Sequence, residues 1–389
     1  MASMHAREGG RLLQMGVPQE AVKAFQKGLS IDPHDVDCLL GLVRTHLSTG
    51  AAAEAEAAVL RLLKVKPDHV EGQGHLAMLR AQAGNAEALE ALKVLAAAPD
   101  AGYFERFNLG SLLFERGDLA GARAAFASAL EVVPGSAHTH FELGRIGMQS
   151  GDLLSAVTHF QKASELAPQE AMPLLMLSRA HAARGDVGLA LQTATQVLDK
   201  AQGATQRAAL EDLFKLYLAA GSPDGAKRAV LELRRLEPTN VNYVYLHGVA
   251  MMSAGQGAEA KALFAEALQG SPSSWQVRHA LAQVCTALGE RDMARSLLEE
   301  VVSAVPRELG PANDLAALLM AENAHALALP VLERALAAHP RDAGTHLNLA
   351  RATQSVDAVT AARHARQAQA LGDSDIQAQA AQLLEQLGA

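Results

Sequence analysis

The stretch YFERFNLGSLLFERGDLAGARAAFASALEVVP, residues 103–134, decides how this chain folds, because most of the remaining sequence repeats it loosely. Its apolar residues recur three and four positions apart in two series, one on each side of Gly117 and Asp118. This spacing predicts two amphipathic helices joined by a turn. Gly117 can adopt a positive φ and Pro134 cannot continue a helix, so both helices have a marked end. The stretch is therefore predicted to form one helical hairpin.

Small residues recur where the two helices are expected to cross. With Tyr103 counted as position 1, Gly110 stands at position 8 and Ala122 at position 20. Two helix backbones approach closely only where side chains are nearly absent. We therefore expect the hairpin to close around these two positions.

The combination of Leu-Gly at positions 7 and 8, Gly at 15, Ala at 20, Phe at 24, Ala at 27 and Pro at 32 resembles the tetratricopeptide repeat. Prolines mark the period, which is 34 residues in most intervals: Pro33, Pro67, Pro99, Pro134, Pro168, Pro238, Pro272, Pro306 and Pro340. The resemblance implies an all-α fold, a right-handed α-solenoid superhelix of helix-turn-helix hairpins. We expect about eleven repeats in a single solenoid over residues 2–372, followed by a C-terminal capping helix over residues 373–389.

Two junctions break the period, near residues 97–102 and 200–207. The second helix of repeat three ends early at Pro99, and repeat seven is expected to begin near Arg207 after a longer linker. Elsewhere Gly recurs at position 15, with Asn323 in its place in repeat ten, and Asp at position 16 is predicted to cap the following helix. Ser374 is expected to cap the last helix at its start and Gly388 at its end.

Composition excludes several classes of protein. Apolar residues make up 49% and aromatic residues 4% of the 389 residues, which suits closely packed, Ala-rich helices. A net charge of -8 argues against a protein that binds nucleic acid or anionic membranes through a broad basic surface. No apolar run of membrane-spanning length and no signal peptide occur, so we expect a cytoplasmic protein. The Ala-rich style indicates a bacterial origin, and Cys38 and Cys285 are expected to be buried, unpaired thiols.

No set of residues predicts catalysis, a cofactor or a metal. The string Gly255 to Ala260 has glycine spacing similar to a dinucleotide-binding turn, but it follows a predicted helix and is explained by the repeat. The densest histidine group is His138, His140 and His159, of which His138 and His140 point in different directions on one helix. We expect these to be histidines at the molecular surface, and we expect the protein not to be an enzyme.

The resemblance implies that the first helix of each repeat lines a concave groove through positions 2, 5, 9, 12 and 13. Position 9 carries a cation in three consecutive repeats, and four of the nine phenylalanines fall at positions 2, 5 or 12. The residues predicted to form the partner-binding groove are Arg44, Phe104, Phe107, Phe114, Phe141, Arg145, Met148, Arg179, Lys215 and Tyr245. In the alternative interpretation, the phenylalanines pad neighbouring repeats and the arginines pair with Glu142 or Glu211.

The favoured function is a non-enzymatic scaffold or adaptor that binds a partner peptide or protein segment with apolar anchors and acidic groups along repeats four to eight. The alternative is a targeting or regulatory subunit of a separate enzyme or of an envelope or secretion assembly, such as a glycosyl- or sulfotransferase, a polysaccharide exporter or a pilus. Self-assembly through open repeat ends is disfavoured by the polar capping helix. The family's asparagine ladder at position 6 is represented only by Asn108 and Asn348, so general clamping of peptide backbones is not expected.

Overall fold

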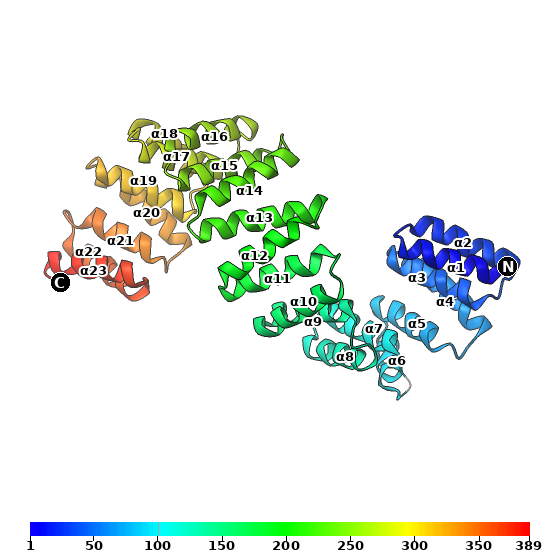
Figure 1. The fold of residues 1–389 in the computed structure, drawn as a ribbon. Coiled ribbons are helices and arrows are strands. Elements are labelled where there is room, and N and C mark those ends of the chain that lie inside the picture. The colour runs from blue at the N-terminus through cyan, green and yellow to red at the C-terminus, as the bar shows by residue number, and fades with distance from the viewer. Residues whose placement is uncertain (100) are drawn as a thin grey trace. The chain divides into compact units, whose positions relative to one another are not determined.

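A computed structural model describes residues 1–99 and 101–389, and within these ranges the chain forms 23 helices joined by short connections, with no strand (Figure 1). Odd-numbered helices from α1 to α21 are the first helices of the hairpins and are called A helices. Even-numbered helices from α2 to α22 are the second helices and are called B helices. The all-α solenoid of helical hairpins is thus confirmed.

Contacts between residues divide the chain into two units, residues 1–201 and residues 202–389, and each is described by itself. Unit 1 contains α1 (Ala2–Gln14), α2 (Pro18–Ile31), α3 (Val36–Ser48), α4 (Ala52–Val65), α5 (Val70–Gln82), α6 (Ala86–Ala97), α7 (Tyr103–Glu115), α8 (Leu119–Val132), α9 (Ala137–Ser150), α10 (Leu153–Leu166), α11 (Ala171–Arg184) and α12 (Val187–Leu198). Each A helix packs on its own B helix, and neighbouring A helices such as α5 and α7 also touch.

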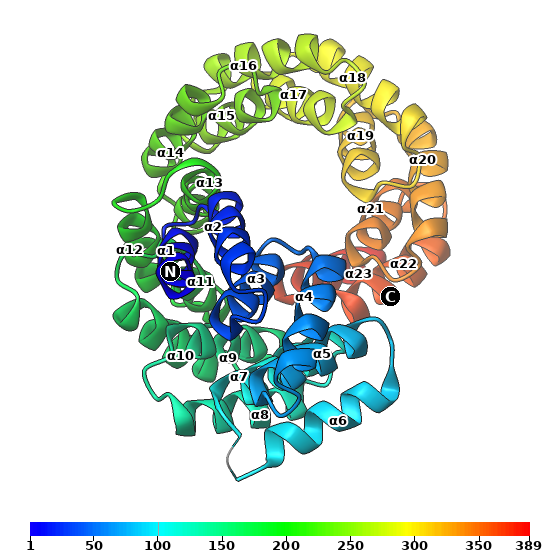
Figure 2. The ribbon, with the colours of Figure 1, turned by 90° about the vertical axis from the view of Figure 1, so that its right-hand side faces the viewer.

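Unit 2 continues the same alternation. It contains α13 (Gly203–Ala219), α14 (Pro223–Leu236), α15 (Val241–Ser253), α16 (Gly257–Gly270), α17 (Trp275–Ala287), α18 (Arg291–Ala304), α19 (Leu309–Ala321), α20 (His325–Ala338), α21 (Ala343–Thr353), α22 (Ala358–Leu371) and α23 (Ser374–Leu387). Figure 2 shows α15, α17, α19 and α21 as the inner layer of this unit and α16, α18, α20 and α22 as its outer layer. Side chains of A helices that face away from the B helices therefore line the inner surface.

The turn between the helices of a hairpin depends on one left-handed residue. All nine glycines at position 15, from Gly16 to Gly289, have φ between +65° and +92°, and Asn323 has φ of 60° at the same place. Side chains disfavour this conformation, and Asn tolerates it better than most residues. The turn signal predicted from the sequence is confirmed in all ten of these repeats.

Capping at position 16 follows the prediction only in part. Asp118 and Asp152 accept hydrogen bonds from the backbone N–H of Gly121 (2.9 Å) and Ser155 (3.2 Å). Asp186 makes no such bond to α12, and its carboxylate lies 3.2 Å from Nε of Arg184 instead. The prediction that Asp caps each of these helices is therefore wrong for Asp186, because a nearby guanidinium competes for the carboxylate.

The helix crossing uses small residues in two different ways. A Cβ on Gly144, at position 8, would lie 2.6 Å from the ring of Phe160, and Gly110 has the same relation to Phe126. A Cβ on Gly147 would lie 2.7 Å from the backbone N of Ala156. Position 8 thus makes room for the Phe ring at position 24, whereas the closest approach of the two backbones in this hairpin is between positions 11 and 20.

Some boundaries differ from those predicted. Helix α13 begins at Gly203, four residues before the expected start at Arg207, so Gly203 is a helical residue and not part of a linker. The irregular junction predicted at residues 97–102 includes residue 100, which lies outside the described residues. At the C-terminus the side chain of Asp373, and not Ser374, caps α23 by accepting a hydrogen bond from the N–H of Ile376, while Gly388 ends the helix with φ of 66° as predicted.

Candidate partner-binding surface

The A-helix surface of unit 1 begins with a guanidinium held between a carboxylate and an aromatic ring. Arg44 on α3 donates from Nε and Nη2 to the two carboxylate oxygens of Glu71 on α5, both at 2.9 Å. Its Cζ lies 5.3 Å from the ring centre of Phe104 on α7. Phe104 is 41% exposed. Three successive A helices are thereby connected by a surface of alternating charge and aromatic character.

Polar contacts behind this cluster fix its orientation. His75 lies with Nε2 3.4 Å from Oε1 of Glu71, and its Nδ1 faces Nδ2 of Asn108 at 3.4 Å. Burial alone would raise the pKa of the Glu71 carboxyl, but the hydrogen bonds from His75 and Arg44 hold it below its usual value. Glu71 is therefore a carboxylate at neutral pH, and Arg44 is already neutralised within the chain.

Two further aromatic side chains of this surface are partly exposed to solvent and partly packed into the core. Phe107 and Phe141 are both half-buried. Phe107 packs against Phe126 with ring centres 5.2 Å apart, and Phe141 packs against Phe160 at 5.5 Å, each pair edge to face. Both residues face the A-helix surface on one side and support the hairpin core on the other, so only part of each ring is accessible to a partner.

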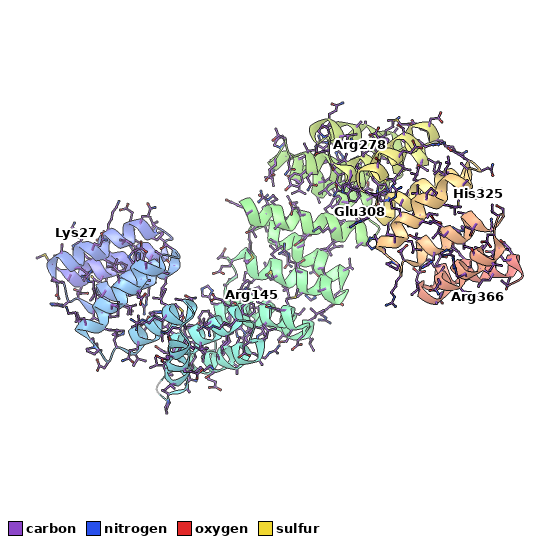
Figure 3. All side chains as sticks on the ribbon, turned by 180° about the vertical axis from the view of Figure 1, so that it is seen from behind. Lys27, Arg145, Arg278, Glu308, His325 and Arg366 are labelled. Atoms are coloured by element: carbon purple, nitrogen blue, oxygen red, sulfur yellow. The ribbon has the colours of Figure 1, made fainter. Side chains whose placement is uncertain are left out.

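A second cluster of a guanidinium and an aromatic ring lies further along unit 1. Arg145 on α9 places its Cζ 4.6 Å from the ring centre of Phe114 on α7. The same guanidinium donates to both carboxylate oxygens of Glu142 at 2.8 and 3.1 Å (Figure 3 labels Arg145). Met148, one turn further along α9, is half-buried. Arg145 thus pairs with Glu142, as the alternative interpretation of the sequence expected.

The remaining predicted groove residues occupy less connected places. Arg179 on α11 of unit 1 is half-buried, and Lys215 on α13 of unit 2 is exposed. Tyr245 on α15 lies with its ring centre 5.6 Å from that of Phe264, and burial raises the pKa of its phenol. It also lines a hollow of about 400 Å³ together with Ser271 and other polar residues. The ten predicted residues therefore divide into eight on unit 1 and two on unit 2.

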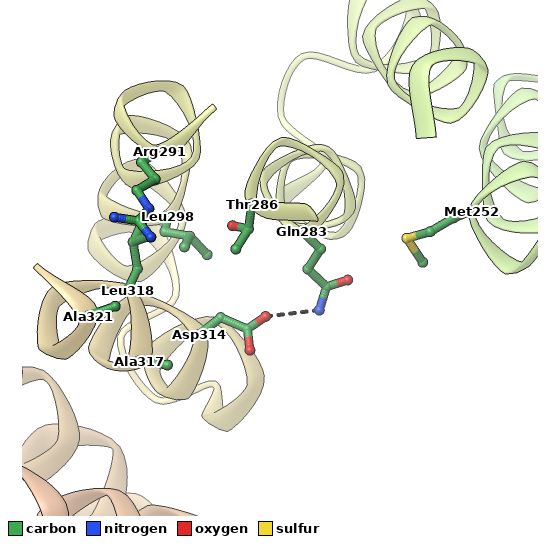
Figure 4. Close-up of a pocket in the computed structure, with 9 residues that line it drawn as sticks. All are labelled: Met252, Gln283, Thr286, Arg291, Leu298, Asp314, Ala317, Leu318 and Ala321. Atoms are coloured by element: carbon green, nitrogen blue, oxygen red, sulfur yellow. Dashed lines mark hydrogen bonds between the residues drawn. The ribbon is translucent and has the colours of Figure 1, made fainter. Parts of the chain in front are cut away.

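Two wider pockets open on the A-helix surfaces. In unit 1, Arg7, Asp37, Arg44 and the side-chain-free Gly10 border a pocket of about 510 Å³ between α1 and α3. In unit 2 a pocket of about 560 Å³ is lined by Met252, Gln283, Thr286, Arg291, Leu298, Asp314, Ala317, Leu318 and Ala321 (Figure 4). Both have the dimensions of a site for a peptide side chain or a short segment.

Comparison with known families decides the identity of the fold. Two family profiles, both described as "Tetratricopeptide repeat", match the chain, one at residues 12–83 and 251–318 and the other at residues 107–171, 141–205 and 211–274. The chain belongs to the tetratricopeptide repeat family. Together the matched segments cover most of both units, in agreement with the register read from the prolines.

Solved structures show the same tetratricopeptide repeat fold. A tetratricopeptide repeat protein from Parabacteroides merdae is similar over 65% of this chain and 99% of its own, with 19% identity and a TM-score of 0.53. Yeast Tom70 is similar over 100% of this chain and 95% of its own, with 17% identity and a TM-score of 0.51. A comparison with the curated proteins gave no match. At these identities the likeness concerns the fold alone.

In the pocket of unit 2, Asp314 is a residue that the repeat pattern did not single out. Asp314 accepts hydrogen bonds at Oδ2 from Nε2 of His279 (2.8 Å) and from Nε2 of Gln283 (2.9 Å), and the second is drawn in Figure 4. Burial opposes ionisation of Asp314, yet these bonds hold its pKa below the usual value. Asp314 stands at position 6 of its tetratricopeptide repeat. A carboxylate at this position is the feature of the sequence that could have predicted a polar site here.

Three further features of the part of the chain that the structure describes concern metals, thiols and membranes. No three His, Cys, Asp or Glu side chains converge there as a group that could hold a metal ion. Cys38 and Cys285 are both free and buried, as predicted. None of the helices is long and apolar enough to cross a bilayer, again with residue 100 left aside.

Proposed function

We propose that this tetratricopeptide repeat protein is a non-enzymatic scaffold that binds an extended or helical segment of a partner protein on the A-helix surface of unit 1. The observation that supports it best is the exposed ring of Phe104, which is presented beneath Arg44 rather than packed into the core. Exposed aromatic rings beside guanidinium groups are typical of binding hot spots. Phe114, further along the same helix α7, lies beneath Arg145 in a similar arrangement.

The chemistry of this surface suits a partner with apolar or aromatic anchors. Phe104 and the accessible parts of Phe107 and Phe141 offer apolar contact area, and Met148 can adjust to different side chains. Repeat arrays use extended concave surfaces of this kind to bind other proteins. Acidic groups on the partner would meet Arg145 and Arg179 on the same unit.

A single truncation tests the aromatic anchor. The full chain carrying Phe104→Ala is compared with the wild type as bait for proteins of its source cell, identified by mass spectrometry. Leu154→Ala is the matched control, because Leu154 is 67% exposed but lies on the B helix α10. We expect Phe104→Ala to lose partners that Leu154→Ala retains. Equal recovery with both variants would refute this surface as the binding site.

Charge reversal tests the cations independently. Replacing Arg145 and Arg179 together by Glu is expected to abolish capture of partners with acidic segments, while the far-ultraviolet circular dichroism stays helical. A separate enzyme or export component recovered as the sole partner would favour the role of a targeting or regulatory subunit. Unchanged binding by this double variant would remove these cations from the proposal.

A further inference from the structure

Two pairs of histidines, one in each unit, adopt the same geometry. In unit 1, Nδ1 of His140 on α9 lies 3.1 Å from Nδ1 of His159 on α10. In unit 2, Nδ1 of His346 on α21 lies 2.9 Å from Nδ1 of His364 on α22. Each pair joins position 4 of the repeat, on the A helix, to the seventh residue of the B helix. The ring centres are 5.4 and 5.2 Å apart.

The other nitrogen of each A-helix histidine is also engaged in the same way. Nε2 of His140 lies 3.3 Å from the carbonyl oxygen of Pro134, and Nε2 of His346 lies 3.2 Å from that of Pro340. A carbonyl oxygen can only accept, so each Nε2 carries the hydrogen. In the neutral ring Nδ1 is then a bare lone pair, and it points at the Nδ1 of its partner.

Two facing nitrogens at this distance either share a hydrogen atom, as in an N–H···N hydrogen bond between two neutral rings, or bind one metal ion. Zinc binds imidazole nitrogen at about 2.0–2.1 Å, so two imidazoles on one ion have nitrogens about 3.3–3.4 Å apart at the tetrahedral angle and about 2.8–3.0 Å apart when that angle closes to about 90°. The observed separations, 3.1 and 2.9 Å, lie below the tetrahedral value and within the range between these two angles. The bond from Nε2–H to a backbone carbonyl is also the outer contact that metal-binding histidines usually make.

We infer that each pair is a binding site for zinc or a neighbouring late first-row divalent ion, held by two imidazole Nδ1 atoms and completed by water. No third His, Cys, Asp or Glu among the described residues joins either pair in a group that could hold an ion, so the remaining positions belong to solvent. His140, His159 and His364 are only half-buried, which leaves room for water. Imidazole is a preferred ligand of these ions.

The charged surroundings set the expected strength. Arg123 and Lys162 lie near the unit 1 pair, although Arg123 is bonded to Asp152 at 3.1 Å, and Arg363 lies near the unit 2 pair. Positive neighbours and only two protein ligands make each site weaker than a four-ligand structural zinc site. Occupancy would tie the A helix to the B helix of repeats five and eleven.

Titration with zinc chloride at pH 7.5 tests the inference on the full chain without a histidine tag. Isothermal calorimetry should give two zinc ions per wild-type chain, one for His159→Gln, one for His364→Gln and none for the double variant. His138→Gln is the matched control, because His138 is exposed on α9 but belongs to neither pair, and it should retain both ions. Zinc binding that is absent, or that is unchanged by the double variant, would overturn the assignment.

A second measurement does not depend on the variants folding. X-ray absorption at the zinc edge of the wild-type chain loaded with two equivalents should show an average of two imidazole nitrogens and additional oxygens per ion. One imidazole or fewer, or four nitrogen ligands, would contradict the proposed sites.

Thermal unfolding gives a third readout. The melting temperature of the wild-type chain should rise on zinc addition, because binding to the folded state alone stabilises it. The rise should vanish in the double variant.

Discussion

Replacing Gly147 by Ala tests the closest approach of two helices in unit 1. The added Cβ would lie 2.7 Å from the backbone N and 2.9 Å from Cα of Ala156, whose own side chain is fully buried. Ordinary contact is about 3.5 Å, so α9 and α10 would have to separate by roughly 0.7 Å. Overpacking costs about 1–3 kcal/mol, and main-chain atoms that cannot rotate away favour the upper half of that range. Removing a helical glycine recovers about 1 kcal/mol, which leaves a net loss of about 1–2 kcal/mol.

The same substitution at Gly10 is the matched control. Gly10 lies inside α1, and apart from its chain neighbours and the backbone of its own helix no heavy atom stands within 4 Å of the position that its Cβ would occupy. Alanine should therefore stabilise α1 by about 0.5–1 kcal/mol through its better helix propensity. The two Gly→Ala variants are expected to have opposite signs although the chemical change is identical.

Hydrogen exchange followed by mass spectrometry is the suitable assay, because long repeat arrays need not unfold in one step. A loss of about 1–2 kcal/mol corresponds to roughly 5- to 30-fold faster exchange in peptides from α9 and α10. Peptides from α1 should exchange more slowly in the Gly10 variant. Unchanged or slower exchange in α9 and α10 of the Gly147 variant would refute the close crossing between positions 11 and 20.

Three further predictions concern packing, pH and thiols. Gly144→Leu should lower stability by at least about 1–3 kcal/mol because the side chain enters the space of the Phe160 ring, whereas Gln149→Leu at an exposed site should cost little, as thermal melts will show. Burial, Arg234 and Lys227 lower the pKa of His247 in the folded state, so the unfolded state takes up the proton first as pH falls below about 6.5. The urea midpoint of unfolding should therefore drop between pH 7.5 and pH 5.5. The drop should be smaller in the His247→Gln variant. Burial, reinforced by Asp35, raises the pKa of Cys38 to about 12, and burial also raises that of Cys285, so a thiol reagent at pH 8 should label neither residue until the chain is unfolded.

The fold could be predicted from the sequence because its determinants are local and periodic. Gly117 and Asn323 indicate left-handed turns because Gly and Asn tolerate a positive φ better than other residues. This tolerance depends only on the residue type, so the sequence shows it directly. The partner of a small residue was harder to predict. Gly144 and Ala156 both looked like crossing residues, but Gly144 receives the Phe160 ring and Ala156 receives the backbone at Gly147. The position of a residue in the repeat predicts which face of the helix it occupies. Only the three-dimensional structure shows which atoms of the neighbouring helix contact it.

The candidate site shows more clearly what the position of a residue in the repeat cannot predict, namely its partner on another helix. Position 9 correctly placed Arg44 and Arg145 on A helices, but Glu71 is 27 residues from Arg44, and their pairing depends on how α3 and α5 pack. The His140 and His159 pair was missed for the same reason: neighbours on one helix were compared, whereas the partner lies across the hairpin. Residues at the same position of different repeats therefore differ in their contacts with neighbouring helices, and the sequence pattern does not show this difference.

The two guanidinium clusters should therefore differ in what they offer a partner. Arg145 pairs with Glu142 three residues earlier on the same helix, and such pairs are worth only about 0.2–0.5 kcal/mol, so an acidic group of a partner can displace Glu142 at little cost. Arg44 makes a two-pronged contact with Glu71, which His75 also holds, and displacing that carboxylate would leave it without its cation in a half-buried place. We expect Arg145 to bind acidic groups of a partner, and Arg44 to act mainly by orienting the exposed ring of Phe104.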